Sequence, residues 1–211
     1  MIAAIAYALL IASVAGLRLF GWPYKSMLLL ISLAVMALAA LALFSIWQGK
    51  WSGLLHLMPL AITLPFIMAG MTRPPVADVA TRWDPAITFP EELARLSENS
   101  LDPSLAVFEA FQGAYQDIRT QITDEDPGAA ILEVGQRMGW SLVERTPSHA
   151  QFEVTSRLLG FVDDVMVEWS ATDEGYRVDL RSRSRVGFSD LGANADRIRR
   201  FFAQLSSRTS A

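Results

Sequence analysis

The sequence predicts three N-terminal transmembrane α-helices followed by a two-layer α+β domain, in which an antiparallel sheet of about five strands has two helices on one face. Charge is unevenly distributed along the 211 residues: none lies between Ser26 and Gly49, whereas beyond Glu91 charges recur every few residues. In the C-terminal half, apolar and polar residues alternate with the period of two that is typical of strands. Turn residues such as Gly160 and Asp173-Glu174-Gly175 separate these alternating stretches, which indicates hairpins.

Three apolar segments define the predicted membrane region, residues 1–71: Met1 to Phe20, Met27 to Trp47 and Leu54 to Met71. About 20 apolar residues in a helix cross a hydrocarbon core of about 30 Å, and a backbone in lipid must satisfy its own hydrogen bonds. The short connections carry tryptophans and lysines, which interfaces favour. A cleaved signal peptide is the alternative for the first segment. It is disfavoured because no Lys or Arg precedes the apolar run.

Residues 72–117 are predicted to form a Pro-rich connecting segment. Its five prolines favour an extended tether with one short helix at 91–97. A second helical pattern, at 104–118, is interrupted by Gly113.

The soluble domain is expected at residues 118–206, followed by a disordered tail at 207–211. Its predicted order is β-α-β-β-β-β-α. Asp126-Pro127 begins the first helix, and Ser189 or Asp190 caps the last. The strands are expected at 118–123, 140–145, 150–158, 162–171 and 176–186.

Period-two alternation assigns side chains to the two faces of this sheet. On the last strand Val178, Leu180, Ser182 and Ser184 should face the helices, and the intervening arginines should face away. On the strand before it, Asp163 should point towards the helices and Asp164 away from them.

Two motifs resemble those of the family called domain of unknown function 1499. They are Gly160-Phe161-Val162-Asp163-Asp164-Val165 and the stretch from Arg181-Ser182-Arg183-Ser184-Arg185 through Gly187-Phe188-Ser189-Asp190-Leu191-Gly192-Ala193-Asn194. Residues 74–81 resemble the lead-in of membrane-anchored bacterial members. The resemblance implies a bacterial inner-membrane protein with a periplasmic domain, and it brings no known activity. The positive-inside rule conflicts with that side: with three spans, four cations against one favour a cytoplasmic domain. The family resemblance is the stronger indication. Some members carry an Asn-Cys motif, which this cysteine-free chain lacks.

A candidate polar site combines the charged residues of these motifs. Arginines could bind a phosphate or carboxylate beside the start of a helix. The structural alternative is that the acids and arginines pair across strands and that Asp190 caps a helix. The candidate residues are Asp163, Asp164, Arg183, Arg185, Ser189, Asp190 and Asn194.

A second candidate is an anion- or lipid-binding face formed by Arg157, Arg177 and Arg181. Acidic residues on the same face would partly neutralise it. His149 is expected in a surface turn.

These observations favour a non-catalytic integral membrane protein whose soluble domain binds a protein partner, an anionic small molecule or lipid. One alternative is an envelope hydrolase with Asp163 or Asp164 as general base and Arg183 holding an anion. Another is an accessory subunit of a larger membrane complex. No cofactor or metal site is expected, since no set of metal-ligating side chains converges in the sequence. A net charge of −4 argues against nucleic-acid binding.

Overall fold

The computed structural model describes residues 2–20, 23–59, 61, 64, 68, 72–101, 114–157 and 159–209. The chain divides into an N-terminal unit, residues 1–69 together with 157–160, and a larger unit made of residues 70–156 and 161–211. Each unit is described by itself.

The described residues of the N-terminal unit include the α-helices α1 (Ile2–Phe20) and α2 (Tyr24–Trp47) and the 3₁₀ helix η1 (Trp51–Leu57). The first two helices pack through small and aliphatic side chains, among which Ala6, Ala34 and Leu38 are buried. Close packing through alanines is typical of helix pairs in lipid. Large apolar side chains elsewhere on both helices remain exposed.

The prediction of three transmembrane helices is wrong. Within the described residues, α2 is the one helix that is long and apolar enough to cross a membrane. The apolar stretch found in α1 is shorter, Ile2–Leu17. The third segment begins as the 3₁₀ helix η1, a geometry that is seldom sustained over many residues. Most of residues 60–71 lie outside the described part.

The second unit is built on a six-stranded antiparallel sheet with the order β1-β6-β5-β4-β3, and β2 also pairs with β6. The strands are β1 (Asp78–Ala80), β2 (Gln121–Thr123), β3 (Ser141–Arg145), β4 (His149–Thr155), β5 (Val162–Thr172) and β6 (Gly175–Ser184). Five of them correspond to the predicted strands. The sixth, β1, pairs with the end of β6, so that Asp78 lies opposite Arg183.

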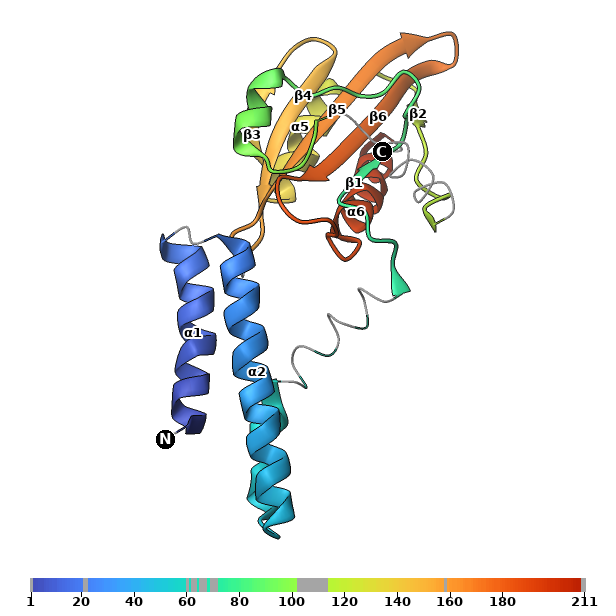
Figure 1. The fold of residues 1–211 in the computed structure, drawn as a ribbon. Coiled ribbons are helices and arrows are strands. Elements are labelled where there is room, and N and C mark those ends of the chain that lie inside the picture. The colour runs from blue at the N-terminus through green and yellow to red at the C-terminus, as the bar shows by residue number, and fades with distance from the viewer. Residues whose placement is uncertain are drawn as a thin grey trace. The chain divides into compact units, whose positions relative to one another are not determined.

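Two helices, α5 (Gly128–Arg137) and α6 (Ala193–Thr209), cover one face of the sheet, here called the inner face (Figure 1). Ile131 and Val134 of α5 and the apolar stripe of α6 form the main core with inward residues of β4, β5 and β6. The faces predicted for Val178 and Leu180 of β6 are therefore confirmed.

Residues 81–101, here called the strap, cross the opposite, outer face of the sheet (Figure 1). The strap contains the short 3₁₀ helix η2 (Glu91–Leu96). Its Ile87, Phe89 and Leu93 are buried against Met166 of β5 in a second apolar cluster. Residues 78–101 of the predicted connecting segment thus pack on the domain, and the short helix expected at 91–97 corresponds to η2. The helix predicted at 104–118 falls mainly on residues outside the described part.

Candidate functional site

Cross-strand rows of polar side chains lie on the outer face of β4, β5 and β6. The strand register places Asp164 opposite Arg183, as the sequence predicts, and Glu168 opposite Asp179. Directly opposed acid and base side chains stabilise a sheet. From the strap-covered end to the open end, the rows are Glu153–Asp164–Arg183, Gln151–Met166–Arg181 and His149–Glu168–Asp179.

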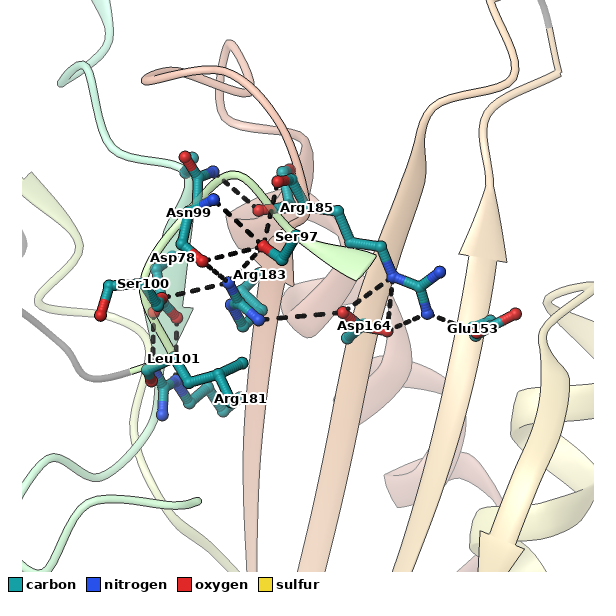
Figure 2. A network of polar contacts seen from close by, with 12 residues as sticks. Asp78, Ser97, Asn99, Ser100, Leu101, Glu153, Asp164, Arg181, Arg183 and Arg185 are labelled. Atoms are coloured by element: carbon teal, nitrogen blue, oxygen red, sulfur yellow. Dashed lines mark hydrogen bonds and ion pairs between the residues drawn. The ribbon is translucent and has the colours of Figure 1, made fainter. Parts of the chain in front are cut away.

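Asp164 lies at the centre of the first row and is fully buried. Arg185 donates to both of its carboxylate oxygens at 2.7–3.1 Å and also binds Glu153 (Figure 2). Nη1 of Arg183 is 3.9 Å from the same carboxylate. Burial lowers the pKa of Arg185, but its hydrogen bonds to Asp164 and Glu153 outweigh burial, and the net pKa is raised.

Arg183 is held chiefly by the strap. Its Nη2 lies 2.8 Å from Ser97 Oγ, 2.8 Å from the Asn99 carbonyl and 3.1 Å from the Ser100 carbonyl (Figure 2). Burial is the main cause that lowers the pKa of Arg183. The Asn99 amide donates in turn to the Ser184 and Gly187 carbonyls, both at 2.8 Å. The strap is therefore bonded to the end of β6 and to the residues that follow it.

Arg181 is 1% exposed and makes a two-pronged ion pair with Asp78, at 3.0 and 2.6 Å. It also donates to the carbonyls of Ile87 and Leu101 in and at the end of the strap. The Phe89 ring lies within 5.2 Å of the Arg181 guanidinium and within 5.7 Å of that of Arg183. These contacts compensate the positive charge of Arg181 within the domain.

Of the three arginines of the predicted anion or lipid face, Arg181 is buried beneath the strap. The two other arginines of that prediction do not lie together. Arg157 is exposed in the turn after β4, whereas Arg177 lies near the beginning of β6, towards the opposite end of the sheet.

A second network occupies the inner face. Asp163 accepts from Nη2 of Arg197 at 2.5 Å, and Nη1 of the same arginine is 2.6 Å from Ser182 Oγ. Asn194 accepts from Ser182 and donates to Ser184 Oγ and to the Ala77 carbonyl. All are at most 8% exposed. The sequence analysis missed Arg197, although its position three residues after Asn194 places it on the same helix face.

Asp190 caps the first turn of α6 by accepting from the backbone N–H groups of Gly192 and Asn194. Ser189 Oγ accepts from the N–H of Leu191 at 3.2 Å. The backbone here turns sharply, with φ of 56° at Leu191 and 83° at Gly192. Burial raises the pKa of Asp190 against the opposing effect of these hydrogen bonds.

The seven candidate residues thus do not converge on one site. Asp163 belongs to the inner network and Asp164 to the outer one, and each carboxylate is bonded to an arginine. A general base needs a perturbed pKa beside space for a substrate. Asp163 and Asp164, the general-base candidates of the hydrolase alternative, are both buried and lie on opposite faces of the sheet.

A groove of about 240 Å³ opens beside the third row, next to the first residues of the strap. Within it Arg82 bridges Glu168 at 2.5 Å and Asp179 at 2.9 Å. Asp179 is 1% exposed and also accepts from Thr81 and Thr120. The lining residues are Arg82, Ser148, His149, Glu168, Trp169, Ser170, Arg177 and Asp179.

The polar groups that remain available in the groove are mainly donors. Arg177 approaches Asp179 through Nε at 3.1 Å, and its side chain is 42% exposed. Nδ1 of His149 lies 2.9 Å from Thr146 Oγ1, which leaves the other ring nitrogen for a ligand. Within the described residues, the hydroxyls of Ser148 and Ser170 make no hydrogen bond. The sequence analysis placed His149 in a surface turn and did not connect it with Arg177.

A family profile described as "Protein of unknown function (DUF1499)" matches residues 90–205. The chain belongs to this family. The resemblance of the two motifs is thereby confirmed, and the match extends further towards the N-terminus, into the strap. The DUF1499 match includes every groove residue except Arg82. No curated protein matches the chain.

Proposed function

We propose that this protein is a membrane-attached, non-catalytic binding protein whose DUF1499 domain holds a small anion in the groove beside Arg177. The observation that carries the proposal is the excess of available donors there. Once Arg82 is paired with Glu168 and Asp179, the guanidinium end of Arg177 and the hydroxyls of Ser148 and Ser170 remain for a ligand.

An oxyanion, either a carboxylate or a phosphate, fits this set of donors. A guanidinium presents two parallel N–H groups to such a group, and hydrogen bonds between charged partners are roughly twice as strong as neutral ones. The two groove carboxylates would repel an anion if they were free. Asp179 is buried and accepts from two threonines and from arginine, so its charge is largely compensated.

A non-catalytic role is supported by the arginine contacts that already occupy the carboxylates of Asp163 and Asp164. A carboxylate that accepts from a buried arginine is poorly suited to remove a proton. The groove carboxylates have the same arrangement, because Arg82 contacts both Glu168 and Asp179.

Attachment through α2 also favours a domain outside the cytoplasm. With a single span, Arg18 and Lys25 lie on its N-terminal side, and Lys50 follows on the other. Arg73 lies beyond the roughly 15–20 residues over which such charges count. The charge rule and the family resemblance then agree on a bacterial plasma-membrane anchor with a periplasmic domain.

Calorimetric titration of the full chain in mild detergent tests the groove, with inorganic phosphate and succinate as probes at constant ionic strength. Arg177→Ala should weaken binding by roughly 10- to 100-fold, since a hydrogen bond to a charged group contributes about 1.5–3 kcal/mol. Arg137→Ala is the matched control, because Arg137 is also half-exposed and ion-paired but lies on α5. Equal affinities of the two variants, or no binding by the unmodified chain, would contradict the proposal.

A further inference from the structure

Three segments of the second unit meet at one end of its sheet, here called the proximal end. The chain enters β1 there, since the N–H groups of Ser184 and Asp190 donate to the carbonyls of Ala77 and Val76. Strand β5 begins at the same end, because Arg185 N–H donates to the Val162 carbonyl. The loop from 185 to 192, between β6 and α6, is the third segment.

Phe188 lies in this third segment and is 82% exposed. It is the most exposed large apolar side chain among the described residues of the second unit, in which the next is Leu96 at 57%. Single exposed apolar residues are common on protein surfaces, so the exposure of Phe188 does not by itself indicate a partner.

The second observation is that the loop is braced on both sides of Phe188. The Asn99 amide donates to the Gly187 carbonyl at 2.8 Å. Nη1 of Arg73 donates to the Leu191 carbonyl at 2.7 Å and pairs with Asp196 at 2.9 Å. Gly192 leaves room for this arginine, since a Cβ there would lie 2.3 Å from Nη1. Phe188 is thus presented to solvent by a fixed loop.

The loop is also bonded to Arg73, a residue that closely follows the apolar N-terminal part of the sequence. Residues 57–71 contain no charged side chain, and Arg73 follows two residues later. Two residues span at most about 7 Å. Since Arg73 is bonded to Leu191, the proximal end is tied directly to the end of the apolar part of the chain.

We propose that the Phe188 loop inserts into the surface of the lipid bilayer and docks the proximal end of the DUF1499 domain on the membrane. Aromatic side chains favour the interfacial layer of a bilayer. The inference rests on the membrane attachment proposed above and not on anion binding in the groove. The groove lies on the other half of the strands, at Glu168–Ser170 and Arg177–Asp179.

The absence of cysteine allows a site-specific test in the full chain. A single cysteine is introduced by Phe188→Cys, labelled with an environment-sensitive fluorophore, and the protein is reconstituted in phosphatidylcholine–phosphatidylglycerol vesicles. Leu142→Cys on β3 is the matched control, because Leu142 is also exposed, at 52%, but lies on the edge strand farthest from β1. Neither change removes a buried side chain, so both variants should fold.

Spin-labelled lipids with the quencher near the headgroup should reduce emission at position 188 by about twofold or more, since interfacial groups lie about 5–10 Å deep. The label at position 142 should lose little emission. Equal quenching at the two positions in vesicles that carry the protein on flotation would overturn the docking alone. Failure of the unlabelled chain to float with vesicles would overturn membrane attachment, and the docking with it.

Discussion

Replacement of Asp164 by asparagine should strongly destabilise the domain. The carboxylate is fully buried, receives three contacts from Arg185 within 3.1 Å and lies 3.9 Å from Arg183. Asparagine keeps the size but removes the charge, so two buried guanidinium groups lose their central counter-ion. Breaking one partner of a buried ion pair costs about 3–5 kcal/mol. Arg185 retains Glu153, which places the expected loss near the lower limit, about 3 kcal/mol.

The assay is thermal unfolding of the full chain in mild detergent, followed by near-ultraviolet circular dichroism. For a unit of this size, 1 kcal/mol shifts Tm by about 3–4 °C, so Asp164→Asn should lower Tm by about 10 °C. Asp173→Asn is the control, because Asp173 is exposed in the β5–β6 turn. Its effect should stay within about 0.5 kcal/mol.

A small effect of Asp164→Asn, equal to that of Asp173→Asn, would refute the assignment of Asp164 to a structural role. Catalytic side chains are commonly held at a cost in stability, so their replacement tends to be neutral or stabilising. A stable Asp164→Asn variant would therefore return the general-base hypothesis to consideration.

Two further predictions concern pH and sidedness. Because burial raises the pKa of Asp190 above its usual 3.8, the folded state binds this proton more tightly than the unfolded state, and stability should fall as pH rises from about 3.8 through the raised value. Asp190→Asn keeps a capping acceptor and should lack this decline, as urea titrations between about pH 4 and 7 would reveal; parallel curves for both proteins would contradict it. Alkaline phosphatase fused after Ala211 should be active if the domain lies outside the cytoplasm, whereas activity of only a cytoplasmic reporter at that site would contradict the orientation.

The local pattern of the sequence was sufficient for the sheet between β2 and β6. Alternation with period two assigned Asp163 and Asp164 to opposite faces, because adjacent side chains on a strand must diverge. The same rule placed Ser182 inward and Arg183 outward, as their contacts with α6 and the strap confirm. Alternation could not predict which polar residues contact one another, because those contacts depend on which segment covers each face of the sheet.

The local sequence pattern did not predict how β1 and the strap that follows it pack on the sheet. Residues around β1 contain prolines and only three consecutive strand residues, Asp78–Ala80, so they resemble a tether. Their burial comes from pairing with β6, about one hundred residues later in the chain. A similar limit applied to the membrane region, where composition predicted three spans, whereas among the described residues only α2 is long and apolar enough to cross a membrane.

The arginine–serine alternation in residues 181–185 is accounted for by architecture. Its arginines bond Asp78, Asp164 and the strap on the outer face, and its serines bond Asn194 and Arg197 on the inner face. One strand thereby joins three layers, which explains the pattern without a ligand. A function should then depend on polar and apolar groups that this network leaves unused. Within the described residues of the domain, Arg177 in the groove and Phe188 on its braced loop meet that condition.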